Sequence, residues 1–204
     1  MLALDLLGLG PVLPVVVLDR AEDAVPVAEA LVAGGVTTME LTLRTPVALA
    51  AIEAVAAKVP GIVIGAGTVV SPGQARDAVS AGARFLVSPG SPESLVDAMA
   101  AAKVPFLPGV STATEAMALL ARGVTELKLF PASAVGGPAL LRALSGPLPQ
   151  LTFCPTGGIT PETAGDYLSL SNVACVGGSW LTPPGLVASG DWAGITALAR
   201  ARPL

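Results

Sequence analysis

The segment TMELTLRTPVALAAIEAVAAKVPGIVIGAG, residues 38–67, contains the pattern that predicts the fold. Its two apolar runs, 38–43 and 62–67, have the length of strands, and the alanine-rich stretch between them, 46–58, has the length of a helix. This stretch opens with Pro46, a residue that helix starts favour. The segment therefore predicts a strand, a helix and a second strand, the unit that joins parallel strands.

The same alternation continues along the whole chain. Alanine-rich segments of helical length separate the strand-like runs. Predicted helices that end near an Ala-Gly sequence alternate with predicted helices that end near a Val-Pro sequence, so a unit of two strands and two helices repeats roughly every 45 residues. The six further strand-like runs cover residues 12–18, 85–88, 106–110, 126–130, 152–154 and 174–176. Eight buried strands alternating with helices, without a linker, predict an α/β fold, a single-domain (β/α)8 TIM barrel over residues 1–204.

A doubly wound sheet is the alternative fold. It would normally carry a glycine-rich fingerprint after its first strand, where this chain has Leu18-Asp19-Arg20. Residues 1–7, MLALDLL, are apolar but contain an acid and lack a basic start. We therefore expect a short N-terminal capping helix there rather than an export signal.

Composition and charge exclude several classes of function. The 204 residues are 52% hydrophobic, enough for a sizeable core, but no uninterrupted apolar run approaches the roughly 18 residues of a spanning helix. The formal net charge is −4 without a Lys/Arg cluster, which argues against nucleic acid as a partner. The absence of histidine excludes His triads and His metal sites. Cys154 and Cys175 lie in apolar runs and are expected to be buried free thiols of a cytoplasmic protein.

Lys128 is the strongest candidate for catalysis. Lys58 and Lys103 both occur in AAKVP stretches typical of surface helix ends, whereas Lys128 lies inside the apolar run LKLF, residues 127–130. Burial removes hydration from an ammonium group and lowers its pKa, which yields a neutral amine that attacks ketones and forms a Schiff base. The alternative is a lysine that extends to the strand end or pairs with a carboxylate such as Glu126.

The second strand-like run carries polar residues at alternate positions. In TMELTLR, residues 38–44, strand alternation places Glu40, Thr42 and Arg44 on one face, which we expect to point into the barrel. Glu40 suits a proton shuttle, and Arg44 can bind a carboxylate through two parallel hydrogen bonds. A structural ion pair between Glu40 and a cation is the alternative.

Further signals occur at the ends of the other strand-like runs. The glycines of GAGT, residues 65–68, let a ligand approach the backbone, and the Thr68 hydroxyl can form a hydrogen bond with it. The motifs SPG at 88–90 and FPA at 130–132 are weak signals when taken alone. Glycine pairs beside a hydroxyl occur in PTGG and GGSW, residues 155–158 and 177–180. Backbone N–H groups there can bind phosphate without a net positive charge, although tight turns also require glycine.

Taken together, these motifs closely resemble the 2-keto-3-deoxy-6-phosphogluconate (KDPG) and 4-hydroxy-2-oxoglutarate (KHG) aldolase family. The motifs are MELTLRT at 39–45, GAGT at 65–68, SPG at 88–90, LKLFPAS at 127–133, PTGGI at 155–159 and GGSW at 177–180. The resemblance implies a metal-independent class I aldolase without a cofactor, which cleaves KDPG to pyruvate and D-glyceraldehyde 3-phosphate in the Entner–Doudoroff pathway. It also implies a homotrimer, and some members cleave KHG to pyruvate and glyoxylate as well.

The resemblance assigns roles by position. Lys128 matches the Schiff-base lysine and Glu40 the general acid/base. The pyruvate end matches Arg44, Thr68, Pro89 and Phe130, of which the first two bind the carboxylate. The phosphate end matches Thr156, Gly157, Gly158, Gly178 and Ser179.

One position departs from the family, and three other functions stay open. Some relatives place a basic residue near the phosphate where this chain has Val17, and Arg20 is a candidate to replace it. The other functions are a galactonate-series (KDPGal) aldolase, a phosphosugar isomerase or epimerase that uses Glu40 as base, and a non-catalytic or engineered scaffold derived from the aldolase.

Overall fold

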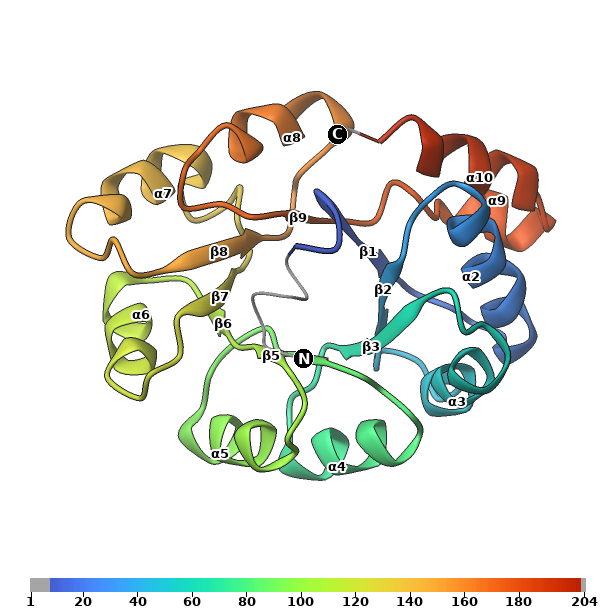
Figure 1. Cartoon of the computed structure of the whole chain (residues 1–204), viewed down its shortest axis with the longest axis horizontal. Coiled ribbons are helices and arrows are strands. Elements are labelled where there is room, and N and C mark those ends of the chain that lie inside the picture. Colours follow the sequence, from blue (N-terminus) through green and yellow to red (C-terminus); the bar gives the residue numbers. More distant parts are fainter. Residues whose placement is uncertain (1–7, 203–204) are drawn as a thin grey trace.

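The computed structural model describes residues 8–202, and these residues form parallel strands surrounded by helices (Figure 1). The predicted capping helix over residues 1–7 lies outside the described residues. A six-stranded sheet has the order β5-β4-β3-β2-β1-β9, and a three-stranded sheet has the order β6-β7-β8. The strands are β1 (Val12–Val16), β2 (Thr38–Thr42), β3 (Val63–Gly67), β4 (Leu86–Val87), β5 (Phe106–Leu107), β6 (Gly109–Val110), β7 (Glu126–Leu129), β8 (Thr152–Pro155) and β9 (Val176–Gly178).

The helices follow the strands in sequence and pack outside them (Figure 1). Their apolar faces point toward the strands, as the alternating sequence pattern predicts. They are the 3-10 helix η1 (Ala21–Asp23), α2 (Ala24–Ala33), α3 (Ala48–Lys58), α4 (Pro72–Ser80), α5 (Glu93–Ala101), α6 (Ala113–Leu120), α7 (Gly137–Ser145), α8 (Pro161–Leu168), α9 (Pro184–Ser189) and α10 (Trp192–Arg200). No helix within residues 8–202 is long and apolar enough to cross a membrane.

Local signals explain where individual helices begin. Ser71 caps α4, because its hydroxyl accepts a hydrogen bond of 3.2 Å from the Gln74 backbone N–H, and Pro72 occupies the first turn. Thr112 and Glu115 form a capping box at the start of α6. These caps satisfy N–H groups that a helix cannot pair internally.

The prediction of parallel strands and alternating helices is confirmed, but the strands divide into two sheets. The run predicted as one strand, 106–110, is split at Pro108 because proline has no N–H to donate to a ladder. β5 therefore pairs with β4, and β6 pairs with β7. The Pro108 carbonyl still accepts a 3.0 Å hydrogen bond from the Lys128 N–H, and single bridges such as Thr156↔Gly177 link the β8 and β9 segments.

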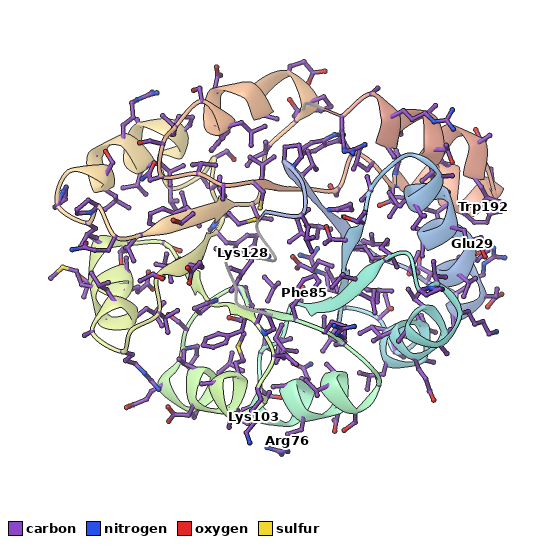
Figure 2. All side chains as sticks on the ribbon, in the orientation of Figure 1. Glu29, Arg76, Phe85, Lys103, Lys128 and Trp192 are labelled. Carbon is purple, nitrogen blue, oxygen red and sulfur yellow. The ribbon has the colours of Figure 1, made fainter. Side chains whose placement is uncertain are left out.

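The two faces of the strands contribute to two separate apolar clusters. Along β1, Val12 and Val16 belong to the large cluster between strands and helices, whereas Leu13 belongs to a smaller inner cluster. Figure 2 shows Phe85 and Lys128 within the ring of helices, and Lys103 at its outside. The inner cluster consists of Leu13, Phe85, Val87, Leu107, Cys154 and Cys175. Both cysteines are buried free thiols, as predicted.

Candidate active site

Lys128 and Glu40 form a buried ion pair between β7 and β2. The Lys128 Nζ lies 3.3 Å from Glu40 Oε1, and the two residues are only 4% and 1% exposed. The lysine is therefore buried, and its partner is Glu40 rather than Glu126, which was the alternative considered from the sequence. Such a pair is costly to desolvate, so its position between two strands points to chemistry more than to stability.

The local backbone leaves room for the Glu40 carboxylate. A Cβ atom on Gly67 of the neighbouring strand would overlap the Glu40 carboxyl group, so glycine is required there. Within the described residues, Glu40 Oε2 has no hydrogen-bond partner although it is buried. This oxygen can accept a proton from a reacting group beside the lysine.

An aromatic ring lies beside the amine. The Lys128 Nζ is 5.4 Å from the centroid of the Phe130 ring, within the range of a cation–π contact. Phe130 is two residues after Lys128, and its carbonyl accepts a 2.6 Å hydrogen bond from the Ser111 hydroxyl. The ring therefore forms a wall on the same side of the strand as the amine.

Arg44 and Thr68 form a second polar group at the ends of β2 and β3. The Arg44 Nε–H donates to the Thr68 Oγ1 over 3.2 Å, so the remaining guanidinium N–H groups can bind an anion. Thr68 has a φ of +56°, a left-handed conformation that is rare for a β-branched residue. Pro89 follows β4. Its backbone packs so closely against Gly109 that a Cβ atom added to Gly109 would clash with it.

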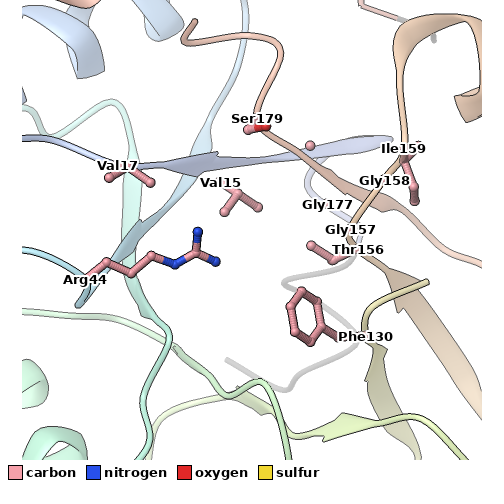
Figure 3. A pocket seen from close by; sticks show the side chains of 11 residues that line it. Val15, Val17, Arg44, Phe130, Thr156, Gly157, Gly158, Ile159, Gly177 and Ser179 are labelled. Carbon is pink, nitrogen blue, oxygen red and sulfur yellow. The ribbon is translucent and has the colours of Figure 1, made fainter. Parts of the chain in front are cut away.

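A cavity of about 270 Å³ opens above Phe130. In Figure 3 the Arg44 guanidinium points into this cavity from the side opposite Phe130 and Thr156. Of the residues between 8 and 202 that line it, Arg44 is the only charged one. The lining residues are Val15, Val17, Arg44, Phe130, Thr156, Gly157, Gly158, Ile159, Gly177, Gly178 and Ser179.

The cavity unites the predicted phosphate end with Arg44 and Phe130, but it does not include every predicted residue. Lys128 and Glu40 are not among the lining residues, but the Lys128 amine contacts the ring of Phe130, which lines the cavity. Thr68 is linked to the cavity by its hydrogen bond with Arg44. Sequence reasoning missed Val15 and Ile159, which also line it. Strand alternation with Val17 could have identified Val15, whereas only the distal fold brings Ile159 to the cavity.

The glycine-rich turns have conformations that side chains rarely adopt. Gly157 and Gly158 have φ values of +100° and +71°, so turn geometry alone requires glycine at both positions. At Gly177 the reason is space, because a Cβ would clash with the Thr156 side chain. A Cβ at Gly178 would clash with the Trp180 ring, which packs against the main core.

Arg20 forms an ion pair with Asp23. Its Nε and Nη2 donate hydrogen bonds of 2.9 and 2.6 Å to the two carboxylate oxygens of Asp23, and Glu22 lies 3.8 Å away. The hydrogen bond and charge of Asp23 raise the pKa of Arg20 further. Arg20 is also not among the residues that line this cavity, and its replacement of a basic residue at Val17 stays a prediction. Residues 8–202 also contain no cluster of three or more acidic or cysteine side chains arranged to hold a metal ion.

Comparison with known proteins identifies the family. The model of the family described as "Aldolase: KDPG and KHG aldolase" matches residues 5–198. The chain belongs to the KDPG and KHG aldolase family. The resemblance seen in the sequence motifs is therefore confirmed.

Individual members of the KDPG and KHG aldolase family are similar over nearly the whole chain. The KHG/KDPG aldolase of Escherichia coli K12 is 49% identical over 96% of this chain and 92% of its own length. The 2-dehydro-3-deoxy-phosphogluconate aldolase of Dickeya dadantii is 50% identical over the same shares. A crystal structure of KDPG aldolase from Legionella pneumophila, with pyruvate captured as a covalent carbinolamine intermediate, is 47% identical with a TM-score of 0.96 over 98% of both chains.

Proposed function

We propose that this chain is a class I aldolase that cleaves KDPG to pyruvate and D-glyceraldehyde 3-phosphate. The observation that carries the proposal is the buried Lys128–Glu40 pair, 3.3 Å apart, beside a cavity that Arg44 lines as the only charged residue among residues 8–202. Family membership and the covalent pyruvate intermediate in the Legionella relative support the same chemistry.

The reaction begins with Lys128 as nucleophile. Its neutral amine attacks the C2 ketone, and the resulting carbinolamine loses water when Glu40 donates a proton. The product is an iminium ion, which withdraws electrons from the neighbouring C3–C4 bond. The unpartnered Glu40 Oε2 supports this role, because it can exchange protons with the carbinolamine hydroxyl without breaking the contact of Oε1 with Lys128.

Cleavage uses the same two side chains. Glu40, directly or through water, removes the proton of the C4 hydroxyl, the C3–C4 bond breaks, and the aldehyde leaves. The electron pair of that bond forms the pyruvate enamine. Protonation at C3 restores the iminium ion, and water then hydrolyses it to release pyruvate and the free lysine.

The remaining site residues hold the two ends of the substrate. Arg44 and Thr68 bind the carboxylate, since the guanidinium points into the cavity and its Nε–H is already oriented by the threonine hydroxyl (Figure 3). Pro89 and Phe130 form walls at the pyruvate end. At the phosphate end we assign Thr156, Gly157, Gly158, Gly178 and Ser179.

A second activity, cleavage of KHG to pyruvate and glyoxylate, shares every step at the lysine. The Escherichia coli relative is named for both substrates, which supports it. Both keto acids present the same carboxylate and C2 ketone to Arg44 and Lys128, and they differ only at the aldehyde end.

We further propose that the two sheets close into one (β/α)8 barrel that forms a single domain over residues 1–204. The Pro108 carbonyl and the Thr156↔Gly177 bridge support closure at the two seams. We also propose a homotrimer, which the family resemblance supports. The two free cysteines support a cytoplasmic location.

Pyruvate release from KDPG tests the proposed reaction. Lys128→Ala should lower kcat/KM on the order of 10³-fold or more, whereas Lys58→Ala, a matched change on the surface, should leave it unchanged. Conversion of KDPG to an isomer without pyruvate would favour an isomerase or epimerase. Faster cleavage of the galactonate-series substrate would favour the KDPGal alternative, and no turnover by folded protein would favour a scaffold.

A further inference from the structure

Ser111 connects the end of β6 to the residue that follows β7. This serine is half-buried, and its hydroxyl donates a hydrogen bond of 2.6 Å to the carbonyl oxygen of Phe130. The N–H of Phe130 donates to the Val110 carbonyl over 3.0 Å. Both polar groups of the Phe130 backbone are therefore held by two consecutive residues, the last of β6 and the one after it.

The serine hydroxyl takes the place of a missing backbone donor. β6 and β7 pair in parallel with Val110 opposite Leu129, so the next donor toward the β7 segment would be the N–H of Thr112. That N–H instead donates to the Glu115 carboxylate over 2.9 Å, because the chain turns there to begin α6. The side chain of Ser111 therefore extends the ladder by one hydrogen bond after the backbone has left it.

The ring of Phe130 borders two parts of the site. The Lys128 Nζ is 5.4 Å from the ring centroid. A Cβ atom added to Gly157 would lie 3.3 Å from two ring carbons, so the ring packs tightly against the glycine-rich turn. Figure 3 shows the ring facing the cavity, across from the Arg44 guanidinium. A shift of the Phe130 backbone would therefore move a wall that touches both the amine and the cavity.

We propose that Ser111 is a positioning residue for the aldolase reaction, which acts through Phe130 by holding its ring beside the Lys128 amine. This inference rests on the proposed function. Ser111 is not among the residues between 8 and 202 that line the cavity, so the role needs no contact with substrate. Without the hydroxyl the Phe130 carbonyl loses its donor, and the ring no longer fixes the position from which the amine attacks the ketone. Small misplacements of reacting groups lower rates strongly.

The proposal is tested by Ser111→Ala, with Ser145→Ala as the matched control. Ser145 is also a half-buried serine whose hydroxyl donates to a backbone carbonyl, that of Arg142 over 2.8 Å, but it lies at the end of α7. Ser111→Ala should lower kcat for KDPG cleavage about tenfold and change KM by less than about threefold, since Arg44 and Thr68 still hold the carboxylate. Ser145→Ala should leave both constants unchanged.

Two further variants show whether the serine acts through the ring. Ser111→Thr keeps a hydroxyl and should retain kcat within about threefold of wild type. In a Phe130→Leu background, where the ring is absent, Ser111→Ala should lower kcat by no more than about twofold, because the two changes disrupt one coupled arrangement. A merely structural serine would cause the same loss of kcat with and without the ring.

Trapping of pyruvate with borohydride, measured on every variant, separates the possible failures. If wild type forms the adduct but Ser111→Ala has the same kcat as Ser145→Ala, the positioning role is wrong and the aldolase stands. The role is equally wrong if Ser111→Thr is as slow as Ser111→Ala, or if the losses in the double variant multiply. Absence of the adduct in folded wild type overturns the proposed function and this inference with it.

Discussion

Gly67 lies beside the Glu40 carboxylate, and a single methyl group at this position would overlap it. We predict that Gly67→Ala displaces the carboxylate and lowers kcat about 10²-fold, because small misplacements of catalytic groups have effects of this size. Overpacking should also cost about 1–3 kcal/mol of stability. Steady-state kinetics and urea unfolding measure the two effects.

The control for this variant is Gly165→Ala in α8. A Cβ at Gly165 meets no other atom within 4 Å, and the position is helical. This change should leave kcat unaltered and raise stability by up to about 1 kcal/mol, since alanine is the better helix former. Unchanged kcat in Gly67→Ala would show that Glu40 tolerates displacement.

A second prediction compares Thr68 with Lys103, because both are non-glycine residues with a left-handed backbone, at φ values of +56° and +57°. Replacement of either by glycine relieves a left-handed conformation and should change stability by similar, small amounts, up to about 1 kcal/mol. Only Thr68→Gly removes the acceptor of the Arg44 Nε–H. It should raise the KM for pyruvate about tenfold, the worth of one charge-assisted hydrogen bond.

Pyruvate kinetics of the two variants, together with Thr68→Ser, check this difference. The serine variant restores a hydroxyl and should recover most of the affinity. If Lys103→Gly raised KM as much as Thr68→Gly, the threonine hydroxyl would have no special part in binding pyruvate.

Single residues also show how far sequence could predict the site. Lys128 and Glu40 could be found because charged residues in apolar strand-like runs are rare and need a partner. Their mutual pairing could not be read directly, since 88 residues separate them and only the fold brings them together. Val15 and Ile159 were missed because an apolar wall has no chemical signature of its own.

At the scale of single elements, α6 is the clearest case of a helix defined by its cap. The Glu115 carboxylate accepts hydrogen bonds from the N–H groups of Ser111 and Thr112, at 2.7 and 2.9 Å. Thr112→Ala should cost about 1 kcal/mol of unfolding free energy. Thr114→Ala, an exposed change within the same helix, should cost nothing, and equal losses in denaturant unfolding would contradict the role of the cap.

The same cap predicts a dependence of stability on pH. The Ser111 N–H, followed by the Thr112 groups, holds the pKa of Glu115 below its usual range. The stabilisation is therefore complete above the ordinary glutamate pKa of about 4.3 and is lost as pH falls through the lowered value. Glu115→Gln should be less stable than wild type at pH 7, and the difference should shrink in acid; a constant difference between pH 7 and pH 3 would contradict this.

Elements were predicted well where proline and capping residues mark their ends. The predicted helix 46–58 and the observed α3 end at the same residue, Lys58. The run 106–110 was predicted as one strand, but it divides because Pro108 cannot donate a ladder hydrogen bond. Apolar patterning alone does not report such a loss of pairing.

For the whole molecule, the two apolar clusters predict how its thiols react. Cys154 and Cys175 lie in the inner cluster, and the hydrogen bond that the Cys175 thiol donates to Cys154, together with burial, raises the pKa of Cys175 well above its usual value. A neutral, buried thiol is unreactive. Labelling with a thiol reagent across a denaturant series should follow global unfolding, and rapid labelling of native protein would show that the inner cluster opens locally.

Overall architecture was predictable from the period of strands and helices, but the arrangement of strands into sheets was not. The alternation predicts parallel strands inside a ring of helices, which Figure 1 shows. Division into sheets depends on a few hydrogen bonds at Pro108 and around Thr156, and these depend on local geometry that the sequence pattern does not encode.

The central claim is that Lys128 forms a Schiff base with pyruvate, and intact mass after incubation with pyruvate and borohydride tests it most directly. Wild type should gain one reduced pyruvyl group, Lys128→Ala should gain none, and Lys58→Ala and Lys103→Ala should behave as wild type. No adduct on folded wild-type protein, or an adduct that persists in Lys128→Ala, would contradict the assignment.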